Sequence, residues 1–99
     1  MSSSFSEGVL VTIIGEAVLQ DRLIKMLTDL GVSGYTIIPA KGAGSHGRRM
    51  GDIAGYNTNI EVKAIVTSAD SEKLFEDLKG LQNKYALIAF RQQVDGLFD

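Results

Sequence analysis

Cysteine and tryptophan are absent from this 99-residue chain, and proline and histidine each occur once. Without cysteine, the chain can form neither a disulfide framework nor a thiolate metal site. The single histidine, His46, has no second histidine or cysteine beside which it could ligate a metal, so we predict no metal site. No Ser-His-Asp set and no convincing pair of catalytic carboxylates is visible either, so we predict no catalytic residues.

A long apolar run and an excess of positive charge are also missing. No run approaches the ~20 residues that a membrane-spanning helix needs, and a net charge of −2 argues against nucleic-acid binding. The first residues have neither the basic region nor the apolar core of a signal peptide. We therefore expect one cytoplasmic domain, 1–99, at most peripheral to a membrane, with residues 1–7 a flexible tail.

The pattern of apolar residues predicts six secondary-structure elements. Strands are expected over 9–14, 34–38, 59–67 and 85–90, the last one extending towards 94; Gly15 and Pro39 are expected to end the first two. Helices are expected over 16–30 and to about 81, the second capped by either Ser68 or Asp70. The order strand, helix, strand, strand, helix, strand predicts an α+β fold. It is a ferredoxin-like βαββαβ sandwich, a four-stranded antiparallel sheet with two helices on one face.

The first and fourth strands are apolar at nearly every position, which is typical of strands buried on both faces. Two helices on one face leave the other face of the sheet uncovered. A second copy of the chain is the simplest cover, so we expect a homo-oligomer. The strand aromatics Tyr35 and Phe90 are expected to pack in the core.

Residues 41–58 hold five of the chain's 11 glycines and two of its four arginines. They follow neither a helical nor a strand period, which predicts a long loop between the second and third strands. Glycines allow successive backbone N–H groups to point at one anion, and Lys41, Arg48 and Arg49 add positive charge. The loop therefore suits a phosphate or a small oxyanion. The alternative is a surface loop whose charges are only solvated.

The stretch Gly34-Tyr35-Thr36, a short apolar strand, Lys41-Gly42-Ala43-Gly44, a long loop and a returning strand together resemble the PII signalling superfamily. The resemblance covers about residues 9–94. It implies a ferredoxin-like homotrimer with the sheets packed inward, in which residues 41–58 correspond to the effector-reading T-loop. It also implies that an adenine nucleotide binds in clefts between subunits, beside the base of that loop.

Two departures refine the resemblance. The turn Gln82-Asn83-Lys84-Tyr85 replaces the family's glycine-rich phosphate-binding loop, and Gly96 to Asp99 lacks the family's basic Arg-x-Arg. Both are similar to the branch linked to bicarbonate transporters and carboxysomes, which implies ADP or AMP in preference to ATP, together with bicarbonate. The implied function is a non-enzymatic sensor that regulates inorganic-carbon uptake or carboxysome function, with a bicarbonate transporter or carboxysome component as partner. The alternative is a trimeric metal-tolerance protein of the CutA kind.

Carried over residue by residue, the resemblance implies a set of ligand contacts. Thr36 would contact the adenine side of the cleft, and Gly42 and Gly44 would let the loop base close on ribose and phosphate. Which of Arg48 and Arg49 faces the ligand stays open. The full nucleotide-binding set is Thr36, Lys41, Gly42, Gly44, Ser45, Arg48, Arg49, Lys84 and Arg91, and the bicarbonate-binding set is Lys41, Arg48 and Arg49.

Overall fold

The computed structural model describes residues 5–41 and 59–98. Within them the chain forms the predicted order of strands and helices, with one short 3-10 helix, η1, added after the first strand. The elements are β1 (Ser6–Glu16), η1 (Ala17–Leu19), α1 (Gln20–Asp29), β2 (Thr36–Ala40), β3 (Asn59–Val66), α2 (Ser68–Gln82) and β4 (Leu87–Gly96).

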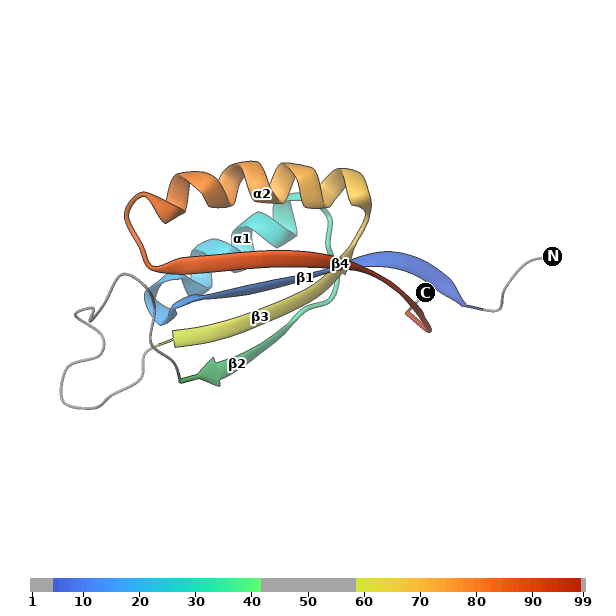
Figure 1. The fold of residues 1–99 in the computed structure, drawn as a ribbon, viewed down its shortest axis with the longest axis horizontal. Helices are drawn as coiled ribbons and strands as arrows, with labels where there is room; N and C mark the ends of the chain where they lie inside the picture. The colour runs from blue at the N-terminus through green and yellow to red at the C-terminus, as the bar shows by residue number, and fades with distance from the viewer. Residues whose placement is uncertain (1–4, 42–58, 99) are drawn as a thin grey trace.

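The four strands form one sheet in the order β2-β3-β1-β4, and every neighbouring pair is antiparallel. Both helices lie on the same face of this sheet (Figure 1). The predicted ferredoxin-like sandwich is therefore confirmed. The sheet order puts β2 and β4 at the two edges, so residues on these strands are separated by the width of the sheet.

The hydrophobic core lies between the helices and the sheet. Alternate residues of a strand point to the same face, and the core-facing series on β1 is Val9, Val11 and Ile13, all buried. Leu23 and Leu27 of α1 pack against it. The remaining buried apolar residues are Leu19, Ile60, Val62, Ala64, Val66, Leu74, Leu78, Leu81 and Leu87.

The first strand is longer than predicted at both ends. Gly15 does not end it, because the ladder continues through Gly15↔Ile60 to Glu16↔Asn59. Gly15 suits this place, since an added Cβ would lie 2.9 Å from Leu87 Cδ1. At the other end the strand begins at Ser6, which pairs with Gly96 of β4, so Ser6 and Glu7, which were expected in a flexible tail, belong to the strand. As a consequence α1 begins at Gln20, after η1.

Pro39 does not stop the second strand. It lies inside β2 and pairs with Ile60 of β3. An edge strand tolerates proline because the missing N–H can face solvent, and β2 is at the edge of the sheet. The start of α2 also differs from the prediction. Thr67 caps the helix, its Oγ1 accepting a hydrogen bond of 3.0 Å from the backbone N–H of Asp70.

We call the side of the sheet away from the helices the open face. Each cross-strand row on it mixes apolar and polar residues; one row runs Thr36, Lys63, Thr12, Phe90 and the next runs Ile38, Glu61, Ile14, Ile88. The core placement predicted for Tyr35 and Phe90 is wrong, because they are 39% and 46% exposed. Ile38 and Ile88 are about half exposed as well. No described helix covers this face (Figure 1), so its apolar side chains stand in solvent in the single chain.

Candidate functional site

A hollow of about 330 Å³ lies at the start of β2, where the open face meets the connection from α1. Thr36 lines it, directly opposite Lys63 of β3 in the ladder. Leu10, Tyr35 and Phe98 add apolar surface. A mostly apolar hollow with a few polar groups is the usual form of a small-molecule site, and its volume is at the low end of the ~300–1,000 Å³ of such sites. The hollow therefore has the size and lining of a site for a small ligand group.

Two further predicted site residues, Lys41 and Lys84, lie close to the ends of the edge strands. Lys41 directly follows β2, and Lys84 lies in the turn between α2 and β4; both are exposed. That turn binds to its own chain. The backbone N–H of Ala86 donates to Glu16 Oε2 at 2.7 Å, and Gln82 Nε2 donates to the Leu87 carbonyl at 3.0 Å. The N–H of Ala86 is therefore already bonded to a carboxylate of the same chain and is not directed at a ligand. This agrees with the absence of a glycine-rich phosphate loop from the sequence.

Arg91 lies on β4 and points to the helix side of the sheet. Its Nη1 donates to Ser71 Oγ at 2.6 Å, and its Nη2 is 2.9 Å from Glu72 Oε2. The guanidinium also lies 5.8 Å from the centroid of the Phe75 ring. These contacts tie β4 to α2. Because Thr36 lies on the other edge strand and on the open face, one chain does not bring Arg91 and Thr36 together.

Five predicted site residues, Gly42, Gly44, Ser45, Arg48 and Arg49, lie outside the described residues. Within 5–41 and 59–98, no group of three or more histidine, cysteine, aspartate or glutamate residues could hold a metal ion. Over the same ranges, no helix is long and apolar enough to cross a membrane. The nucleotide and bicarbonate contacts of the loop therefore stay predictions.

Of the residues that line this hollow, only Thr36 was in the predicted site set; Lys63 and Phe98 are the most consequential of those that sequence reasoning missed. For Lys63 a signal existed, because the alternation Glu61, Lys63 in a strand of otherwise apolar residues marks a polar face. The strand register that puts Lys63 opposite Thr36 was not available from the sequence. For Phe98, no pattern indicates that the residues after β4 return to the sheet.

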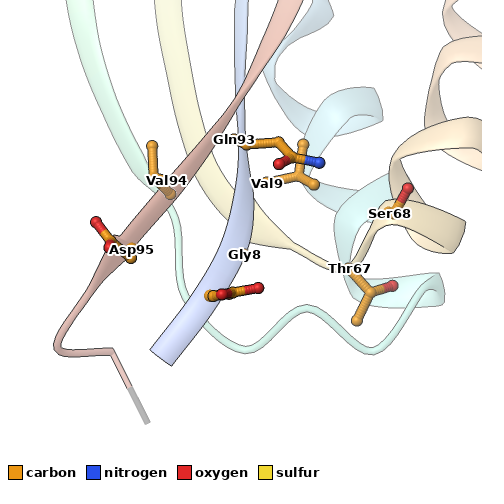
Figure 2. Close-up of a pocket in the computed structure, with 8 residues that line it drawn as sticks. Gly8, Val9, Thr67, Ser68, Gln93, Val94 and Asp95 are labelled. Atoms are coloured by element: carbon orange, nitrogen blue, oxygen red, sulfur yellow. The ribbon is translucent and has the colours of Figure 1, made fainter. Parts of the chain in front are cut away.

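A second and larger hollow, of about 560 Å³, lies at the start of β1, where Glu7, Gly8 and Val9 line it. Figure 2 shows that its lining comes from the start of α2, where Thr67 and Ser68 lie, and from the neighbouring ends of β1 and β4. Two carboxylates, those of Glu7 and Asp95, line it, and no lysine or arginine from residues 5–41 and 59–98 does. An anionic ligand would be repelled there, so this hollow is a poor phosphate site compared with the hollow beside Thr36.

The family model of nitrogen regulatory protein P-II matches residues 9–96 of the chain. The chain belongs to the P-II family. A PII-like signalling protein from Thermus thermophilus is 31% identical to it; the match covers 96% of this chain and 94% of that one, with a TM-score of 0.79. A comparison with curated protein sequences gives no match.

Two solved structures of a more distant P-II relative carry ligands. CPII from Thiomonas intermedia, a nitrogen regulatory PII-like protein bound to ADP, AMP and bicarbonate, is 23% identical, covers 95% of this chain and 92% of its own, and has a TM-score of 0.82. The structure of CPII bound to ADP, AMP and acetate is 20% identical to this chain and has a TM-score of 0.81; the match covers 97% of this chain and 94% of CPII. At this identity the likeness shows a shared fold.

Proposed function

We propose that this P-II protein is a cytoplasmic, non-enzymatic sensor that binds an adenine nucleotide, ADP or AMP in preference to ATP, together with bicarbonate. It signals through residues 41–58 and regulates inorganic-carbon uptake or carboxysome function, with a bicarbonate transporter or a carboxysome component as partner. The observation that carries the proposal is the overlap in fold with CPII, a protein solved with ADP, AMP and bicarbonate. The hollow beside Thr36 supports it with a lining suited to a base.

The placement of the predicted contacts supports sites between subunits. Thr36 begins β2 and Lys41 directly follows it, while Lys84 lies in the turn before the other edge strand, β4, and Arg91 lies in β4. A ligand that touched all four would need contacts from more than one copy of the chain. The open face, with half-exposed Ile38 and Ile88, gives those copies an apolar surface on which to assemble. We therefore propose a homotrimer with the nucleotide in its clefts.

Titration calorimetry tests the proposed function directly. AMP, ADP and ATP are each titrated with and without bicarbonate, and divalent metals are titrated separately. We expect binding of AMP and ADP to be tighter than binding of ATP, and bicarbonate and nucleotide to change each other's affinity by the same factor, as thermodynamic linkage requires. Absence of heat with all three nucleotides would remove the proposal, and metal binding alone would instead support the CutA-like alternative.

The loop arginines give a sharper test, because one of them is expected to contact a phosphate or bicarbonate oxygen. Such charge-assisted bonds contribute roughly 1.5–3 kcal/mol each. Replacing the engaged arginine in Arg48→Ala or Arg49→Ala should therefore weaken ligand binding about 10- to 150-fold. The other variant is the matched control, since an exposed charge contributes at most about 1 kcal/mol. Equal affinities of both variants and wild type for AMP, ADP and bicarbonate would take the loop out of the binding site.

A further inference from the structure

The chain after β4 returns to the sheet and brings Phe98 to the hollow beside Thr36. The ring lies over two glycines on paired strands. A Cβ added to Gly8 of β1 would come 3.3 Å from Phe98 Cε2, and one added to Gly96 of β4 would come 3.2 Å from Phe98 Cε1. The Cβ on Gly8 would first meet Ile65 Cγ2, at 2.7 Å, and at both positions the ring would have to shift by a few tenths of an ångström. The two glycines therefore form a seat that holds the ring close to the backbone of β1 and β4.

Phe98 is held in this seat and yet stays accessible, with 37% of its surface exposed. It also lines two hollows. One is the hollow lined by Thr36, Tyr35 and Lys63. The other, of about 280 Å³, is lined by Phe98 together with Glu7 and Asp70. Ser33 and Ile65 line both hollows as well, so the two are neighbours.

Charge separates the two hollows. Among the residues that the structure describes, Lys63 is the one lysine or arginine that lines the Thr36 hollow, and its Nζ lies 3.4 Å from Glu61 Oε2. The described lining of the smaller hollow has two carboxylates and no lysine or arginine. A phosphate-bearing ligand is therefore favoured in the Thr36 hollow and disfavoured in the smaller one.

We propose that Phe98 is a specificity-determining residue of this site, whose ring stacks on the base of the bound nucleotide and so selects ligands that carry a flat aromatic base. The inference rests on the proposed function, because it supposes that the adenine nucleotide enters the Thr36 hollow. An aromatic ring suits this task because every base has a π face and stacking needs no hydrogen-bond match. Thr36 then supplies a polar contact at the edge of the base.

The test compares Phe98→Ala with Leu97→Ala. Leu97 is the adjacent residue, 82% exposed, and is a matched large-to-small control because it lines none of the three hollows. We expect Phe98→Ala to weaken AMP binding about 5- to 150-fold, the range found when one base-stacking aromatic is truncated. Leu97→Ala should stay within about 2-fold of wild type. Ribose 5-phosphate, measured by its displacement of AMP, should bind the variants and wild type equally, because it has no base to stack.

A second variant gives a readout that a purely structural role would not move. The chain has no tryptophan, so Phe98→Trp creates a single indole fluorophore in the seat. Its AMP affinity should stay within about 2-fold of wild type, and AMP should quench its fluorescence while ribose 5-phosphate does not. Leu97→Trp is the control and should be quenched far less.

The outcomes separate the two claims. Wild-type AMP affinity in a folded Phe98→Ala, or an unquenched Phe98→Trp that still binds AMP, overturns the stacking role and leaves the proposed function intact. No nucleotide binding by the wild type overturns both. If Phe98→Ala fails to fold, Phe98→Leu replaces it, since leucine keeps an apolar group on the glycine seat without a stacking face. An unchanged AMP affinity in Phe98→Leu would then also overturn the inference.

Discussion

Leu74→Ala is expected to lower the free energy of unfolding by about 2–5 kcal/mol, the usual cost of truncating a fully buried leucine. Leu74 is 0% exposed and lies on α2 in the core between helix and sheet. The total free energy of unfolding of a natural domain is about 5–15 kcal/mol, so the variant loses a large part of its stability. Urea unfolding followed by circular dichroism measures the change as a shift in midpoint at constant slope.

Leu97→Ala is the control for this measurement, because the same side chain is removed from a position that is 82% exposed. Its free energy of unfolding should change by less than about 0.5 kcal/mol. Both variants are compared with wild type at several protein concentrations, since association adds concentration-dependent stability. A loss below about 1 kcal/mol for Leu74→Ala would show that α2 is not packed on the sheet as the structure has it.

The core and the fold could be predicted because they follow from spacing alone. Leu23 and Leu27 recur at helical spacing, and the strand over 9–14 is rich in β-branched residues, so element type and order were fixed before any contact was known. The ends of elements were less accessible. Pro39 remains in a strand because β2 is an edge strand. Gly15 remains in a strand because it pairs with a residue of β3 on one side and with a residue of β4 on the other. Both facts belong to the sheet order and register.

The site divides in the same way. Thr36 was predicted from a local motif, and the structure puts it in a hollow. Lys63 and Phe98 line the same hollow but come from β3 and from the residues after β4, far away in sequence. Arg91 was chosen for its charge, and only the structure shows that it bonds to Ser71 and Glu72 of α2. Residues that meet through pairing and packing are not visible in a one-dimensional pattern.

Phe90→Glu should convert the proposed trimer into single chains and abolish nucleotide binding with it. Phe90 is 46% exposed at the outer end of the row Thr36, Lys63, Thr12, Phe90 on the open face. If another copy covers this face, a carboxylate there has no partner and loses its water. Burying an uncompensated charge costs several kcal/mol, and each of the symmetry-related interfaces carries the same penalty. Light scattering should then give 10.7 kDa, the mass of one chain, in place of three times that mass.

Binding should fail in the same variant although each chain remains folded, because Thr36 lies on one edge strand and Lys84 in the turn before the other. If both contact one ligand, they can do so only between copies. Val18→Glu is the matched control: Val18 is 74% exposed in η1, outside the open face, and should keep both trimer and affinity. A Phe90→Glu protein that still has three times the single-chain mass would remove the open face from the interface. A single-chain Phe90→Glu protein that binds AMP as tightly as wild type would instead confine the site to one subunit. The second result would leave the nucleotide hollow of Thr36 standing and remove the inter-subunit cleft.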